Sequence, residues 1–161
     1  MTTLANVPFE VLKVGDKATY QRTLTERDLV LFAEVSGDHN PVHLDKEYAS
    51  TSMFGERIAH GMWTGSLISA ALAMKLPGPG GIYRGQELKF LKPVKLGDTL
   101  TVELEVIEIK ERGGRALMST NVVNQDGVYV VKGTATILPS KGEVILNAPQ
   151  MPAIRIEGLD D

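Results

Sequence analysis

The residues best suited to chemistry in this sequence lie in the short segment 38–43. Asp38 provides a carboxylate, and His43, five positions later, provides an imidazole. A carboxylate and an imidazole that share one water molecule can accept one proton and deliver another, and the near-neutral pKa of histidine suits this task. The pair therefore indicates general acid–base catalysis on a bound water molecule. We expect Asn40, which lies between the two residues, to orient that water.

The backbone around this pair is kept out of regular helix by its own residues. Gly37 frees the chain just before Asp38, and Pro41 removes a donor and clashes with a preceding helical turn. Asn40 must leave the helical region because a proline follows it. Polar side chains on such a constrained loop are typical of functional sites. A structural interpretation also stays open, in which Asp38 and Asn40 only cap nearby backbone in a turn.

A short helix is predicted to deliver the chain to this loop. Residues 18–23 alternate in polarity and are predicted to form a first strand. Thr25 and Asp28 then form a loose capping box, which is typical of a helix start. Apolar residues in 29–35 recur at the spacing of one helix face, and Gly37 ends the helix.

A second helix is predicted over residues 61–75, where almost every side chain is apolar or small. A helix that is apolar on all sides is typical of a buried one, and its small residues let other backbone approach closely. The proline- and glycine-rich stretch 76–81 ends this helix. Between the two helices, residues 44–49 are predicted to form a short helical turn.

The remaining sequence is predicted to be β-structure. Alternation of apolar and polar residues predicts half-buried antiparallel strands. These strands are expected over residues 82–93, 99–110, 115–124 and 128–138. A buried helix followed by a meander of strands fits an α+β fold in which an antiparallel sheet wraps around the helix. We expect one domain over residues 1–161, with an irregular lead-in over 1–16 and an irregular C-terminal tail over 140–161.

The segment around Asp38 and His43 resembles a known motif. The matching residues are Phe32, Val35, Ser36, Gly37, Asp38, Asn40, Pro41, Val42, His43 and Ala49. They agree position by position with the hydratase 2 motif of the MaoC-like (R)-specific enoyl-CoA hydratases, and the resemblance runs from about Pro8 to Pro139. It implies a hotdog fold and reversible hydration of trans-2-enoyl-CoA to (R)-3-hydroxyacyl-CoA, which would supply polyhydroxyalkanoate synthesis or fatty-acid metabolism.

The resemblance also implies roles for individual residues. Asp38 and His43 would activate the water and protonate the substrate, and the sequence leaves open which residue takes or gives each proton. The N–H of Gly61, at the positive end of the buried helix, would stabilise the enolate oxygen, although tight packing is another reason for glycine there. From the residues alone, His60 could be a buried, satisfied histidine or a support for the loop, and we favour support. Ser69 could line the acyl pocket, although a serine within a helix more often bonds back to that helix.

The coenzyme A portion of the substrate carries phosphates, so basic side chains near the site are of interest. The residues considered for this contact are Arg57, Arg84, Lys89 and Lys92. The resemblance implies that coenzyme A enters as part of the substrate and that no separate cofactor is needed. It also implies a homodimer in which two sheets join edge to edge.

Three other functions agree with parts of the sequence. A metal site with His39, His43 and a carboxylate is disfavoured because Pro41 breaks the helical face that this spacing requires, so we expect no metal. A hotdog acyl-CoA thioesterase would share the fold and the thioester, but it usually has a carboxylate on or near its central helix, and residues 61–75 contain none. A non-catalytic acyl-thioester-binding protein would not need an intact Asp38–His43 pair.

The composition argues against several kinds of chemistry and several classes of partner. The chain has 161 residues, of which 43% are hydrophobic, a net charge of −3 and no cysteine. Disulfides and thiolate nucleophiles are therefore excluded, and the charge gives no general attraction to nucleic acid or to an anionic membrane. No apolar run reaches the ~18 residues of a membrane span, and the N-terminus lacks a signal-peptide pattern. We expect a cytoplasmic protein.

Overall fold

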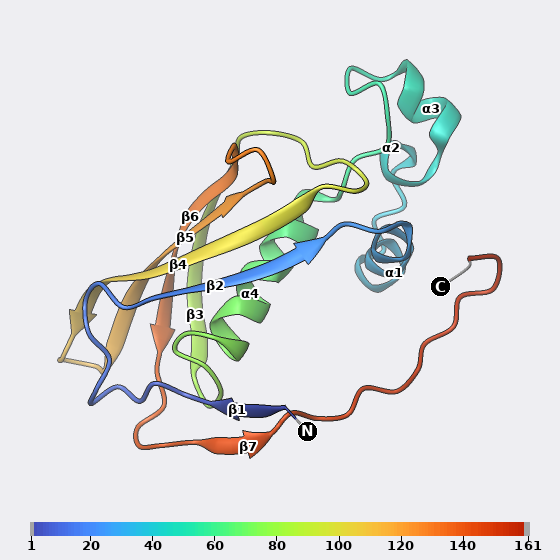
Figure 1. Cartoon of the computed structure of the whole chain (residues 1–161). Coiled ribbons are helices and arrows are strands. Elements are labelled where there is room, and N and C mark those ends of the chain that lie inside the picture. Colours follow the sequence, from blue (N-terminus) through green and yellow to red (C-terminus); the bar gives the residue numbers. More distant parts are fainter. Residues whose placement is uncertain (1, 160–161) are drawn as a thin grey trace.

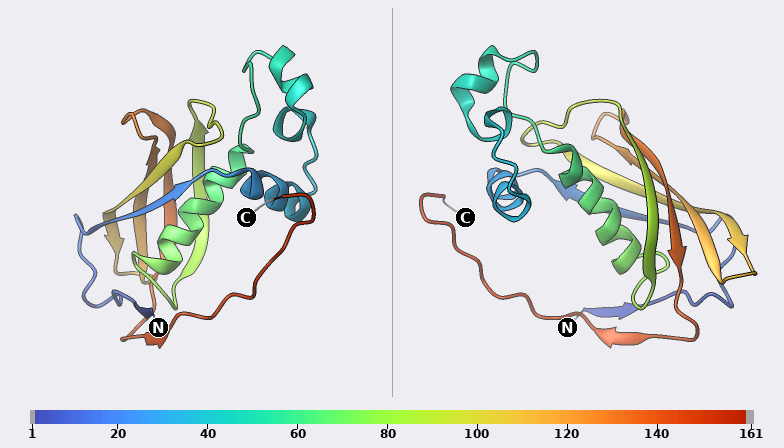
Figure 2. Two further views of the ribbon diagram at one scale, coloured as in Figure 1. Left: turned by 45° about the vertical axis from the view of Figure 1, so that its right-hand side comes forward. Right: turned by 180° about the vertical axis from the view of Figure 1, so that it is seen from behind.

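A curved antiparallel sheet wraps around one long helix (Figures 1 and 2). The computed structural model describes residues 2–159. Its main sheet has the strand order β2-β4-β5-β6-β3. These strands are β2 (Lys17–Thr23), β3 (Ile82–Phe90), β4 (Thr99–Lys110), β5 (Arg115–Val123) and β6 (Tyr129–Leu138). The central helix is α4 (Gly61–Met74), so the predicted α+β hotdog fold is confirmed.

The hydrophobic core lies between the sheet and α4. Along β4, alternate residues point toward the helix and are buried, namely Leu100, Val102, Leu104 and Val106. From the helix, Trp63, Leu67 and Ile68 pack into the same core. Burying one such side chain contributes roughly 1.5–3 kcal/mol, so this alternation holds the sheet on the helix. The pattern that predicted the strands is thus the pattern that forms the core.

Only one face of α4 is buried, which corrects the prediction of a helix buried on all sides. The opposite face carries Met62, which is 57% exposed, and Met74, which is 40% exposed. Ser66, Ser69 and Ala73 lie exposed between them at helical spacing. The sheet of a single chain covers one side of a helix, so the second apolar side stays open.

The helix that leads into the Asp38 loop follows the prediction. It is α1 (Glu26–Ser36), and its N-terminus has the expected capping box. The backbone N–H of Asp28 donates to Thr25 Oγ1, while the N–H of Thr25 donates to Asp28 Oδ2. At the other end, Gly37 has a φ of 74°, a left-handed geometry that glycine adopts without strain.

The structure replaces the predicted helical turn over 44–49 with two short helices. They are α2 (Pro41–Leu44) and α3 (Lys46–Thr51). Asn40 has a ψ of 127°, outside the helical region as predicted, and Pro41 takes the first position of α2, where proline is tolerated. Asp45 then accepts hydrogen bonds from the first N–H groups of α3. Asn40 and Asp45 therefore each cap the start of one short helix, so the segment forms two helices.

The terminal segments are less irregular than predicted. Strand β1 (Thr3–Ala5) pairs antiparallel with β7 (Ile145–Asn147) in a separate two-stranded sheet. After β7 the chain runs extended to α1, where the Arg27 side chain donates a hydrogen bond to the carbonyl of Ile154 (Figure 1). This pairing joins segments far apart in the sequence, so neither segment reveals it alone. Within residues 2–159, no helix has the length and apolar character needed to cross a membrane.

Candidate active site

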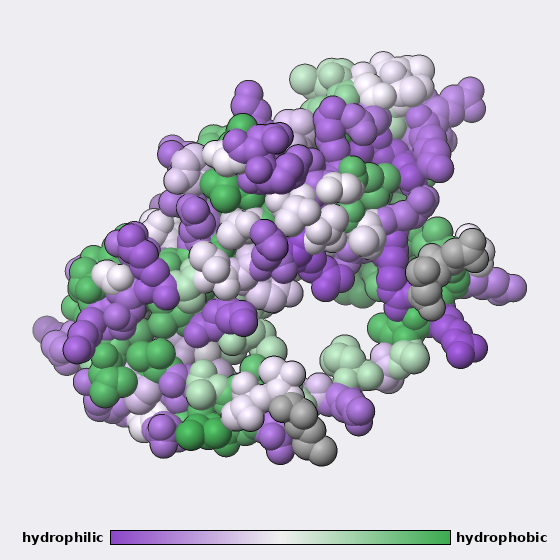
Figure 3. Space-filling model, viewed as in Figure 1, coloured by the Kyte–Doolittle hydropathy of each residue, from purple (hydrophilic) through white to green (hydrophobic). Residues whose placement is uncertain are grey.

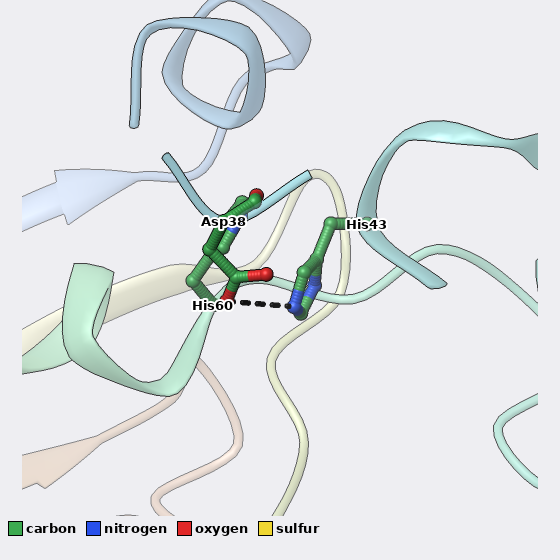
Figure 4. A group of neighbouring side chains, drawn as sticks. All are labelled: Asp38, His43 and His60. Carbon is green, nitrogen blue, oxygen red and sulfur yellow. Dashed lines mark hydrogen bonds and ion pairs between the residues drawn. The ribbon is translucent and has the colours of Figure 1, made fainter. Parts of the chain in front are cut away.

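Asp38 and His43 come together at the loop between α1 and α2 (Figure 4). His43 Nε2 lies 3.9 Å from Asp38 Oδ2. The Asp38 side chain is half exposed, whereas the His43 side chain is buried. The structure therefore brings the predicted pair together, with the Asp38 carboxylate exposed and the His43 ring buried. The distance between them is longer than that of a direct hydrogen bond.

The backbone fixes which nitrogen of His43 faces Asp38. His43 Nδ1 lies 2.8 Å from the carbonyl oxygen of Ile58. A carbonyl only accepts hydrogen bonds, so in the neutral ring Nδ1 carries the proton and Nε2 has the free lone pair. The N–H of Ile58 in turn donates to the carbonyl of Val42. Nε2 is therefore the nitrogen available to exchange a proton.

The capping role foreseen for Asp38 and Asn40 coexists with a role in the site. The N–H of Asn40 donates to Asp38 Oδ1 over 3.2 Å, and the N–H of Val42 donates to Asn40 Oδ1 over 3.2 Å. Asp38 uses one carboxylate oxygen for this turn and turns the other, Oδ2, toward His43. The turn thus orients the carboxylate.

His60 is the residue that connects the two halves of the pair. It is 2% exposed, its Nε2 lies 2.9 Å from the backbone carbonyl of Asp38, and its ring stacks on His43 with centroids 3.8 Å apart. Burial lowers the pKa of His60, which keeps the ring neutral. Within residues 2–159, its Nδ1 is a buried atom without a hydrogen-bond partner. These contacts join His60 to the loop and to His43, and its role as a support of the site stays a prediction.

Three possible metal donors from Asp38, His43 and His60 lie within 4.8 Å of one another. The two rings are stacked at an interplanar angle of 27°, so lone pairs in their planes run side by side. A metal such as zinc needs nitrogens that converge at about 2.0–2.1 Å. This arrangement suits a hydrogen-bonded water better than a metal. His39, the other ligand considered, lines a different cavity with Glu26 and Arg57.

A largely apolar cavity of about 350 Å³ adjoins the pair. It is lined by His43, Phe54, Ile58, Ala59, His60, Gly61, Thr64, Phe90, Leu91, Lys92, Pro93, Val94 and Val131. Gly61 is the first residue of α4, and the first N–H groups of a helix have no partner within it. The Phe90 ring lies against Gly61, since a Cβ added there would come within 3.1 Å of it. The cavity thus combines the first N–H group of a helix with apolar walls.

The other predicted site residues are placed elsewhere in a single copy of the chain. Ser69 lines a second, smaller cavity with Leu72 and Ile137. Arg57 is buried and its Nη1 lies 3.0 Å from Glu26 Oε1, so it has a structural partner. Arg84 is exposed on β3. Of the basic residues considered, Lys92 is the one that lines the cavity beside His43.

Several residues in the cavity wall were not predicted from the sequence. Phe54, Thr64, Phe90 and Leu91 all line it. Apolar residues that face a cavity have the same spacing as residues that face a core, so periodicity alone does not separate them. Phe90 is exposed at the end of β3, and only the packed chain shows this exposure.

Residues 12–127 of the chain match the model of the MaoC-like domain. The chain belongs to the MaoC-like family. Over 136 residues this MaoC-like protein is 43% identical to an (R)-specific enoyl-CoA hydratase of Rhodospirillum rubrum. The aligned region covers 83% of this chain and 93% of that relative.

Two solved structures of relatives have the same fold. The unliganded R-hydratase PhaJ1 from Pseudomonas aeruginosa is 53% identical, with a TM-score of 0.93 over 96% of this MaoC-like protein and 99% of that chain. An (R)-hydratase from A. caviae, involved in polyhydroxyalkanoate biosynthesis, is 39% identical, with a TM-score of 0.77 over 81% of this protein and 98% of that chain. The resemblance carried by the motif is confirmed.

Proposed function

We propose that this protein adds water reversibly to trans-2-enoyl-CoA and forms (R)-3-hydroxyacyl-CoA. The observation that carries the proposal is the placement of Asp38 Oδ2 and His43 Nε2, 3.9 Å apart, beside an apolar cavity that also holds the N-terminus of α4. An acyl chain fits the apolar wall, and one water molecule beside the two polar atoms can form a hydrogen bond with each of them. Relatives named (R)-specific enoyl-CoA hydratases support this assignment.

In the proposed reaction, the pair holds one water molecule against C3 of the substrate. One O–H bond of the water breaks as its oxygen bonds to C3, and the pair accepts the proton. The electrons of the C2–C3 double bond move toward the thioester oxygen, and C2 then receives a proton from the pair. The Nδ1 proton of His43 stays with the Ile58 carbonyl, so Nε2 and the Asp38 carboxylate do the exchange.

The developing enolate oxygen needs a donor that does not have to reorganise. We assign this role to the N–H of Gly61, which begins α4 and lies at the positive end of its dipole. The neutral ring of His60 keeps both partners in position through its hydrogen bond and its stacking contact. The reaction uses no separate cofactor, because water and the enoyl thioester supply every atom.

We also propose that the protein is a homodimer joined at β3. Strand β3 is one edge of the sheet, and several large apolar residues in or next to it are exposed, namely Ile82, Tyr83, Phe90 and Leu91. The other edge, β2, has the sequence Lys-Ala-Thr-Tyr-Gln-Arg-Thr, and polar edges resist pairing with another chain. Two β3 strands can pair antiparallel about a two-fold axis.

The A. caviae hydratase is involved in polyhydroxyalkanoate biosynthesis. We propose the same use for the product made here. A thioesterase is the alternative, but α4 contains no acidic residue to serve as its carboxylate. A non-catalytic thioester-binding protein would not need His43 held in one tautomer beside Asp38.

The test is incubation of the purified protein with crotonyl-CoA, followed by enoyl absorbance and chiral analysis of the product. Loss of absorbance with formation of the (R) alcohol is expected, and Asp38→Asn should abolish most of it. Release of free coenzyme A would indicate a thioesterase. Binding of crotonyl-CoA without either reaction would indicate a binding protein.

A further inference from the structure

The segment after β7 stands away from the rest of the chain. We call residues 148–159 the strap. At its start, the N–H of Ala148 donates to the carbonyl of Thr2, beside the β1–β7 pair. Farther along, Arg27 on α1 holds the carbonyl of Ile154. Between these two anchors the space-filling view shows an open passage bounded by the strap and the main body (Figure 3), and in both views of Figure 2 the ribbon of the strap runs apart from the sheet and α4.

The strap has the composition of a semi-rigid span. Pro149 and Pro152 fix their own φ angles and lack an N–H, so this stretch resists collapse and cannot pair as a regular strand. It nevertheless carries large apolar side chains, with Met151 77% exposed and Ile154 46% exposed. Apolar residues held out on an extended span gain stability only if another surface covers them.

Across the opening from the strap lies the side of α4 that is turned away from the sheet (Figure 2). This open face carries two exposed methionines, Met62 and Met74, with small residues between them. Ile82, at the start of β3, and Ile145, on β7, are exposed as well. Almost every side chain of α4 is apolar or small, which is typical of a helix covered on all sides, yet residues 2–159 cover one side. Two uncovered apolar surfaces therefore face the same opening.

We propose that a second copy of this chain fills the opening and that each strap clasps the other copy. This inference rests on the dimer of the proposed function. An antiparallel β3–β3 pair has its two-fold axis perpendicular to the sheet, so both central helices lie on the same side of the joined sheet. The second copy then lies on the side where α4 is open, next to the strap. Symmetry gives two equivalent clasps.

The first experiment uses a charge placed on the strap. Met151→Asp alters a side chain that is exposed in a single copy, so it should leave the fold of one chain intact. The matched control is Val14→Asp, another exposed apolar residue, in the loop before β2. Sedimentation over a concentration series should show a dimer dissociation constant raised at least 10-fold by Met151→Asp and unchanged by Val14→Asp. Equal constants for both variants would overturn the clasp.

The second experiment identifies what covers the strap. The chain has no cysteine, so Met151→Cys introduces a single thiol that a water-soluble reagent can label. Labelling should be slow at concentrations where the purified protein is dimeric and should approach the rate of a free peptide on dilution. Fast labelling of the dimer would mean that no second copy covers the strap. Slow labelling that does not change on dilution would mean that the strap packs on its own chain.

The outcome is separable from that of the proposed function. Hydration of crotonyl-CoA by the unmodified protein tests the activity, whereas sedimentation and labelling test the clasp without substrate. An active enzyme with a freely labelled strap would disprove the clasp alone. An inactive protein with a concentration-dependent clasp would disprove the hydratase assignment alone.

Discussion

The ring of His60 stacks on the ring of His43, and the same His60 ring donates through Nε2 to the backbone of Asp38. One buried residue thus fixes both members of the pair. It also directly precedes Gly61, the proposed enolate donor, so three parts of the site depend on its position. Errors of about 1 Å in the placement of reacting groups can lower a rate by roughly 10²-fold.

Replacement of His60 should therefore lower turnover more than binding. His60→Phe keeps a flat ring but loses the hydrogen bond to Asp38, and His60→Gln loses the ring. We expect each to lower kcat by roughly 10-fold to 10²-fold with a smaller change in KM. Steady-state kinetics with crotonyl-CoA measures both values. If kcat fell in both variants only in proportion to the fraction of protein that had unfolded, His60 would be a packing residue and not a positioning residue.

The stability of the protein should decrease in mild acid because of His60. Burial lowers the pKa of His60 in the folded state below that of the unfolded chain, which is about 6.5. Above that pH both states are neutral and the stabilising contacts are fully present. As the pH falls below about 6.5, the unfolded chain binds a proton first, so the free energy of unfolding decreases until the folded-state pKa is passed.

Denaturant titrations at several pH values between about 5 and 8 measure this effect. The His60→Gln variant lacks the titrating group, so its unfolding free energy should depend less on pH than that of the unmodified protein. Identical pH dependence in the two proteins would show that His60 is not the group responsible.

Asp38 and His43 should behave as one unit. Asp38→Asn and His43→Gln should each lower kcat by roughly 10²–10⁴-fold, the range for a positioned acid or base. The double variant should be little slower than the slower single variant, because both groups act on one water molecule. His39→Gln is the matched control, since His39 lies on a different cavity and should leave the rate unchanged. Multiplying losses in the double variant would contradict a shared water.

The proposed role of the Gly61 N–H as donor to the enolate oxygen can be tested with Gly61→Pro, which deletes that N–H. The contact of position 61 with Phe90 requires a control. His60 already has a ψ of 135°, the extended geometry that a following proline requires, so Gly61→Pro need not move it. Any Cβ at position 61, however, comes within 3.1 Å of the Phe90 ring. Gly61→Ala alone would therefore disturb Phe90 as well.

Both substitutions should accordingly be compared in a Phe90→Leu background, which removes the ring. Alanine keeps the N–H of Gly61 and proline deletes it. The proline variant should turn over roughly 10²–10³-fold more slowly than the alanine variant, the usual loss for one oxyanion donor. Equal rates in two folded variants would remove Gly61 from the mechanism.

Much of the molecule could be predicted from local sequence. The capping box of Thr25 and Asp28, and the alternation along β4, depend on residues a few positions apart, and both are present as expected. The segment from Gly37 to His43 also folds largely by its own short-range hydrogen bonds. Its motif therefore identified the family and singled out Asp38 and His43 as the proposed reacting pair before any long-range contact was known.

Tertiary structure decided the features that depend on residues distant in the sequence. His60 reaches Asp38 across a separation of 22 positions, and Arg57 reaches Glu26 across 31, so neither partner could be chosen from spacing. The pairing of β1 with β7 and the exposed face of α4 also depend on residues that are distant in the sequence. Local patterns show how apolar a face is, but only the packed chain shows which faces its own residues cover and which remain open for a partner.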